Sequence, residues 1–137
     1  MGYSNFYARF YAICQRTGQT LGAIWRFPAS RWYLALIGLF QIFAWLQAWF
    51  IRRDLTGDLL VLHYNVNFGT DLVGAPSRIF IYPLFGLGIF LLDLIVLAAL
   101  ARHRDWRVFV HLLLGTAMIF GLLLSLVLLS VYLINFR

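Results

Sequence analysis

The sequence of 137 residues is long enough for one domain, and its composition excludes an ordinary soluble globular protein. Hydrophobic residues make up 63% of the chain and charged residues only 12%, so too little polar surface is available to face water. The net charge of +6 comes from arginines placed at the ends of apolar runs, which favours anionic lipid headgroups as partners over nucleic acid.

The first expected element is an amphipathic helix over Tyr3 to Arg16. At about 100° per residue, its aromatic and aliphatic side chains fall on one side, and Arg9 and Arg16 fall on the other. Such a helix lies in the membrane interface, and packing on a partner protein is the alternative. Thr17-Gly18-Gln19-Thr20 is predicted to end this helix, and Pro28-Ala29-Ser30 to restart the chain before the first span.

Three long apolar runs follow and predict an all-α membrane protein with three transmembrane helices. The runs cover residues 32–51, 79–101 and 108–134. Each has the roughly 20 residues needed to cross the hydrocarbon core of a bilayer. Tryptophan and tyrosine side chains near the ends of the runs suit the boundary with water. With the helix that precedes them, the runs form a single membrane domain, residues 1–137.

The distribution of arginines predicts the orientation of the spans. Four arginines precede the first span and three lie in the link from Arg102 to Arg107, on the same side. Four others, Arg52, Arg53, Arg78 and Arg137, lie on the opposite side, where three aspartates dilute them. This bias places the N-terminus inside and the C-terminus outside. The expected location is the inner (cytoplasmic) membrane of a prokaryote.

The loop between the first and second spans, residues 52–78, contains a strand pattern. Apolar and polar residues alternate from Leu60 to Phe68, which is the period of a half-buried strand. Gly69-Thr70-Asp71 is a turn signal, and Leu72-Val73 could return as a short second strand. We expect a short β-like hairpin or extended flap in this outer loop, with its apolar side against the helix ends.

This loop and the start of the second span resemble a known group of proteins. The resemblance rests on Leu62-His63-Tyr64-Asn65, on Phe68-Gly69-Thr70-Asp71 with Gly74, and on Ile81-Tyr82-Pro83-Leu84. The chain resembles uncharacterised small prokaryotic multi-span membrane proteins. More distantly, it is similar to the uncharacterised N-terminal domain of SdpI-like immunity membrane proteins. The resemblance covers roughly Leu60 to Phe136. It implies short spans with an external flap, and it implies no known reaction.

A polar layer is predicted within the spans. Asp93 lies inside the second span, where a carboxylate is costly and by default suggests a functional site. Counted inward from the arginines at the inner boundary, Asp93, Gln41 and Thr116 fall at a similar depth on three different helices. Hydrogen bonding between the helices is the favoured interpretation, and a proton or ion relay is the alternative.

The third span carries a histidine beside small residues. Small side chains recur at four-residue intervals on the first and third spans, namely Ala44 and Ala48, and Ala117, Gly121 and Ser125. This spacing is typical of helix-packing surfaces. Small residues near His111 would also leave room for a haem or chlorophyll, with His111 as its ligand.

No catalytic set is recognisable in the sequence: it has no Ser-His-Asp arrangement, paired carboxylates, HExxH motif or phosphate loop. His63 is expected outside, whereas His103 and His111 are expected inside, so these histidines cannot form one metal site. In the outer loop, a hydrogen-bonded strand face is the favoured interpretation of His63, and ligand recognition by His63, Asn65 and Asp71 is the alternative.

The sequence therefore favours a non-enzymatic accessory or structural subunit of a larger membrane complex. A pigment- or haem-binding subunit using His111 is one alternative, and a small transporter or immunity-type protein is another. The expected partners are the lipid bilayer and other membrane subunits or a second copy of the chain. The sequence requires no cofactor.

Overall fold

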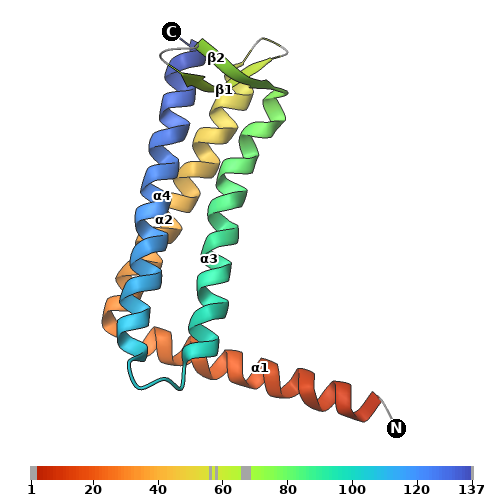
Figure 1. Cartoon of the computed structure of the whole chain (residues 1–137), viewed down its shortest axis with the longest axis vertical. Coiled ribbons are helices and arrows are strands. Elements are labelled where there is room, and N and C mark those ends of the chain that lie inside the picture. The colour runs from red at the N-terminus through yellow and green to blue at the C-terminus, as the bar shows by residue number, and fades with distance from the viewer. Residues whose placement is uncertain (1–2, 56, 58, 66–68, 137) are drawn as a thin grey trace.

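The computed structural model describes residues 3–55, 57, 59–65 and 69–136. The elements follow in the order α1 (Tyr3–Arg26), α2 (Pro28–Asp54), β1 (Leu60–Asn65), β2 (Gly69–Gly74), the 3-10 helix η1 (Pro76–Phe80), α3 (Ile81–Leu100) and α4 (Trp106–Phe136). Helices α2, α3 and α4 form a bundle, the β-hairpin lies across one end, and α1 projects sideways from the other end (Figure 1). Helix α1 and the end of α4 therefore lie at opposite ends of the bundle.

Three helices are long and apolar enough to cross a membrane, as the sequence predicts. They are Pro28–Asp54, Pro76–Leu100 and Trp106–Phe136, with 27, 25 and 31 residues. In the most apolar stretch of each helix, only 22%, 17% and 28% of the residues are buried within the bundle. Most of the large apolar side chains of these helices therefore face outward, which is favourable only in apolar surroundings.

Helix α1 is longer than the sequence predicts. It continues to Arg26, so the helix end predicted at residues 17–20 is wrong. A single glycine costs a helix only about 1 kcal/mol, and no proline before Pro28 blocks the backbone hydrogen bonds. The helix ends at Phe27, whose extended backbone (φ −82°, ψ 113°) is the conformation that a following proline favours.

The corner between α1 and α2 is fixed by side chains just after it. The buried hydroxyl of Ser30 donates toward the carbonyl oxygens of Ile24 and Phe27, at the end of α1. Arg31 donates from Nε to the carbonyl of Trp25 at 2.7 Å, and its guanidinium lies 5.8 Å from the centre of the Trp25 ring. These contacts join the start of α2 to carbonyls at the corner, and they fix the direction in which α1 leaves the bundle.

The outer loop forms an antiparallel hairpin, but its turn differs from the prediction. Leu60 pairs with Gly74, and Asn65 pairs with Gly69, which has a φ of 77°. Residues 69–71 therefore belong to β2, and the turn predicted there is wrong. The first strand ends at Asn65, and residues 66–68 lie outside the described residues. A return strand of only Leu72 and Val73 would have left most of β1 without backbone partners.

The apolar side of the hairpin lies against the helix ends, as expected. Leu60 and Leu62 are buried in one core cluster with Ile51, Ile79 and Leu128. Asn135 near the end of α4 accepts a hydrogen bond from the Val61 N–H (3.0 Å) and donates one to the Val61 carbonyl (2.8 Å). The Tyr82 hydroxyl donates to the Leu62 carbonyl at 3.1 Å. The hairpin is therefore attached to both α3 and α4.

Candidate functional site

The most unusual polar group in the bundle is the Asp93 carboxylate on α3. The Asp93 side chain is only 9% exposed, and its Oδ2 has no hydrogen-bond partner among the described residues. Phe90, Leu94 and Leu97, its neighbours along α3, belong to or pack against the second core cluster of the bundle. A buried polar atom without a hydrogen-bond partner lowers the free energy of unfolding by about 1–3 kcal/mol, so Asp93 destabilises the bundle.

The structure does not assemble the predicted polar layer. Gln41 donates from Nε2 to the Pro83 carbonyl on α3 at 2.6 Å, ten residues before Asp93 in the chain. Thr116 is exposed and donates to the carbonyl of Leu112 in its own helix at 2.7 Å. Neither side chain therefore bonds to Asp93, and a hydrogen-bonded layer of the three residues is contradicted.

The depth of Gln41 was misjudged because α2 starts earlier than the apolar run suggests. The guanidinium of Arg107 lies 6.0 Å from the centre of the Phe27 ring, so Phe27 is level with Arg107. A Cβ added at Gly121 would lie 3.2 Å from the Cβ of Phe40, so Phe40 is level with Gly121 rather than with Thr116. A shift of five residues along a helix is about 7 Å, enough to separate two polar groups.

His111 joins the N-terminal parts of α2 and α4 instead of lying buried. Its Nδ1 lies 3.1 Å from the Tyr33 hydroxyl, and its ring meets those of Phe27 and Tyr33 edge-on at 5.3 and 5.7 Å. The side chain is exposed. The described residues hold no group of three or more His, Cys, Asp or Glu side chains that could bind a metal ion. This arrangement supports a helix-to-helix contact.

The small residues lie where α2 meets α4. Ala44 and Ala48 on α2 are buried, as are Ala117 and Ser125 on α4, and Gly121 lies against Phe40. The backbone carbonyl of Ser125 accepts a hydrogen bond from Gln47 Nε2 at 3.2 Å. Small side chains permit this close approach of the two backbones, which is how apolar helices pack in the absence of large interlocking side chains.

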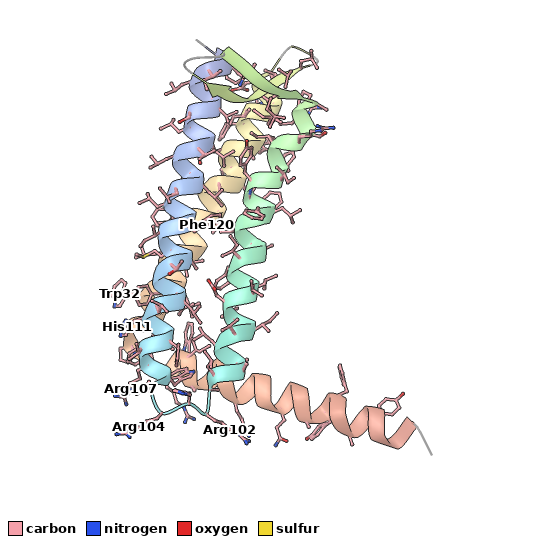
Figure 2. The ribbon with its side chains drawn as sticks, in the orientation of Figure 1. Trp32, Arg102, Arg104, Arg107, His111 and Phe120 are labelled. Atoms are coloured by element: carbon pink, nitrogen blue, oxygen red, sulfur yellow. The ribbon has the colours of Figure 1, made fainter. Side chains whose placement is uncertain are left out.

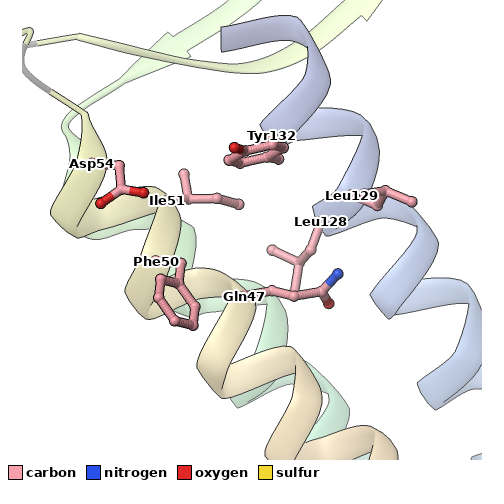
Figure 3. A pocket seen from close by; sticks show the side chains of 7 residues that line it. All are labelled: Gln47, Phe50, Ile51, Asp54, Leu128, Leu129 and Tyr132. Carbon is pink, nitrogen blue, oxygen red and sulfur yellow. The ribbon is translucent and has the colours of Figure 1, made fainter. Parts of the chain in front are cut away.

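A groove between α2 and α4, near the hairpin, was not anticipated from the sequence. It has a volume of about 260 Å³, and Gln47, Phe50 and Asp54 of α2 line it together with Leu128 and Tyr132 of α4. Figure 3 shows Asp54 and Tyr132 toward the hairpin end of the groove and Gln47 at its other end. Gln47 and Asp54 are seven residues apart and so share one face of α2, which is a signal that the sequence does contain.

The backbone of the structure shows where the residues of the outer-loop motif lie in the hairpin. His63, Tyr64 and Asn65 lie in β1 and Gly69 and Asp71 in β2, and His63 pairs with Leu72 across the sheet. The side chains of residues 63–65, 70 and 71 lie outside what the structure describes. Ligand recognition by this motif stays a prediction.

Positive charge gathers at the end of the bundle from which α1 projects. Figure 2 shows Arg102, Arg104 and Arg107 there, at the link between α3 and α4. His103 in this link lies 3.8 Å from the carboxylate of Asp105. The opposite end carries Arg52 and Arg53 in the last turn of α2 and Arg78 in η1. Both ends are therefore basic, and apolar helix surface separates them.

Comparisons with known proteins give no relative: no protein-family model matches the sequence, and neither a curated protein nor a solved structure shows detectable similarity.

Proposed function

We propose that this chain is an integral membrane protein that acts as a non-enzymatic accessory subunit of a larger membrane complex. Three long apolar helices with outward-facing large side chains support insertion into a bilayer. The proposed role as a subunit rests mainly on the position of helix α1. This helix projects from the bundle, and several of its aromatic side chains are exposed.

Helix α1 contributes little to the folding of the bundle. Its 24 residues span about 36 Å at about 1.5 Å per residue. Among its side chains that the structure describes, only Ile24 is buried. Tyr11 is 71% exposed and Trp25 62% exposed. Large aromatic side chains exposed on a projecting helix suit the membrane interface and contact with a second protein.

The proposed orientation places α1 and the α3–α4 link inside and the hairpin outside, in the inner membrane of a prokaryote. It rests on the seven arginines that precede the first span or lie in the link, against four at the other end. The aspartates near the hairpin end reduce the positive charge there further.

Substitutions in α1 test the subunit role. Tyr11→Ala combined with Trp25→Ala should lower the recovered complex severalfold, because both rings are exposed on the projecting helix, and the contact of the Trp25 ring with Arg31 is the one contact described for either ring within the chain. Leu92→Ala combined with Leu123→Ala is the matched control, since these side chains are 58% and 52% exposed on α3 and α4. The measurement is the amount of chain that migrates in a large complex after mild solubilisation.

The control pair should leave the complex intact, and both pairs should remain resistant to extraction from membranes. A wild-type chain that runs as a stable monomer, without other subunits, under the mildest solubilisation would contradict the proposed role.

A further inference from the structure

The groove between α2 and α4 is lined mainly by apolar side chains and has a carboxylate at its hairpin end. Ile51 of α2 lies toward Leu128 and Tyr132 of α4, and Ile51 and Leu128 are almost completely buried there. Asp54, the last residue of α2, lies at the hairpin end, and it has no ion-pair partner among the described residues. The groove therefore offers a carboxylate to whatever enters from the membrane surface, and apolar walls below it.

The polar atoms in this groove favour a donor over an acceptor. The Asp54 carboxylate can only accept hydrogen bonds. The Oε1 of Gln47 also accepts no hydrogen bond from the described residues, but it is buried and lies about 10.5 Å along α2 from Asp54, so it is not part of the proposed cation site. The Tyr132 ring, which stacks on Phe136, also lines the groove, and aromatic rings attract a cation. A positively charged group with N–H donors therefore suits the hairpin end of the groove, where Asp54 and Tyr132 lie.

We propose that this groove binds the ethanolamine headgroup of a phospholipid, with its primary ammonium against Asp54 and an acyl chain along the apolar walls. The inference rests on the membrane insertion proposed above. A volume of about 260 Å³ is too small for a whole lipid and suits a headgroup with the first part of one chain. The rest of the lipid would lie against the exposed helix surfaces.

The residues beside Asp54 fit a zwitterion rather than a simple cation. Arg52 and Arg53 precede it on α2, and the Arg53 guanidinium lies 5.3 Å from the centre of the Trp49 ring. Neither arginine lines the groove. The end of α2 thus offers a carboxylate in the groove and guanidinium groups next to it, the complement of an ammonium joined to a phosphate.

The test is lipid competition on the full chain in nanodiscs. The lipids are phosphatidylethanolamine, phosphatidylcholine and phosphatidylglycerol with identical acyl chains, and lipid retained by the purified protein is counted by native mass spectrometry. Phosphatidylethanolamine should be retained about threefold over both others, a ratio typical of one partly exposed charge contact. Phosphatidylcholine keeps the charge and phosphate but has no N–H donor, and phosphatidylglycerol has no ammonium.

Three variants locate the site. Asp54→Asn should abolish the preference, and Leu129→Trp should displace the lipid by filling a groove that Leu129 also lines. Asp105→Asn removes the same charge in the link between α3 and α4, at the other end of the bundle, and should leave the preference unchanged. Thermal unfolding of each variant confirms that it is folded.

Equal retention of phosphatidylethanolamine and phosphatidylglycerol, or a preference that survives Asp54→Asn, would overturn the inference. Equal retention of phosphatidylcholine would overturn the role of the primary ammonium. A chain that enters nanodiscs without lipid preference refutes only this site, whereas a chain that does not enter them refutes the proposed membrane function.

Discussion

At Asp93, the bundle holds a carboxylate oxygen that is buried and has no partner among the described residues. The Gln41 and Thr116 side chains, which the sequence placed near it, bond to backbone carbonyls elsewhere. Counting residues from the arginines gave the depth of Asp93 in its own helix. It could not give the levels of the other helices, because those depend on where the corner at Phe27 sets the start of α2.

The unpaired state of Asp93 predicts an unusual response to mutation. Asp93→Leu should raise the free energy of unfolding of the isolated chain by roughly 1–3 kcal/mol, since it removes a buried polar group that lacks a hydrogen bond. Asp93→Asn should change it little. Unfolding in mixed detergent micelles measures the effect, and Thr116→Val, at an exposed position, serves as the control with almost no change. Destabilisation by Leu would show that the carboxylate makes a bond on which the bundle depends.

At the scale of the elements, the sequence predicts the three long helices and the hairpin because their signals are local. A long apolar run, or an alternation of apolar and polar residues, can be recognised within a single segment of the sequence. The length of α1 was missed because Thr17 to Thr20 are only mildly unfavourable in a helix, whereas Pro28 is a true break. The groove was missed because it depends on how α2 and α4 are rotated toward each other, which a single segment does not encode.

A pair of glycines on α3 tests how closely the helices are packed. A Cβ added at Gly86 would lie 2.7 Å from Cδ1 of Leu124 and 3.1 Å from Oε1 of Gln41, whereas one at Gly88 would meet nothing within 4 Å. Gly86→Ala should therefore lower the free energy of unfolding by about 1 kcal/mol, near the lower end for overpacking because both atoms end a side chain. Gly88→Ala should be neutral or slightly stabilising. Equal unfolding midpoints for the two variants would contradict this packing of α3.

At the scale of the whole molecule, the proposed insertion of all three long helices into a membrane would put the two ends of the chain on opposite sides. Reporters fused at residue 1 and residue 137 should accordingly report different compartments, with residue 1 inside. A reporter inserted at Gly57, before the hairpin, should agree with residue 137, and one inserted at Arg104 should agree with residue 1. Two ends in one compartment would mean that one of the three helices does not span.

The attachment of the hairpin to Asn135 and Tyr82 has a consequence for the bilayer that would accept this chain. A two-stranded sheet has edges with polar backbone groups, which cannot enter hydrocarbon. In the proposed membrane arrangement, the hairpin would therefore limit insertion on one side of the bilayer, and the sideways helix α1 would limit it on the other. Since α4 is about 46 Å long, at about 1.5 Å for each of its 31 residues, the distance between these two elements is set by the fold. In a bilayer of ordinary thickness the bundle must tilt or draw lipid up around it, so lipids with longer chains should hold it more upright.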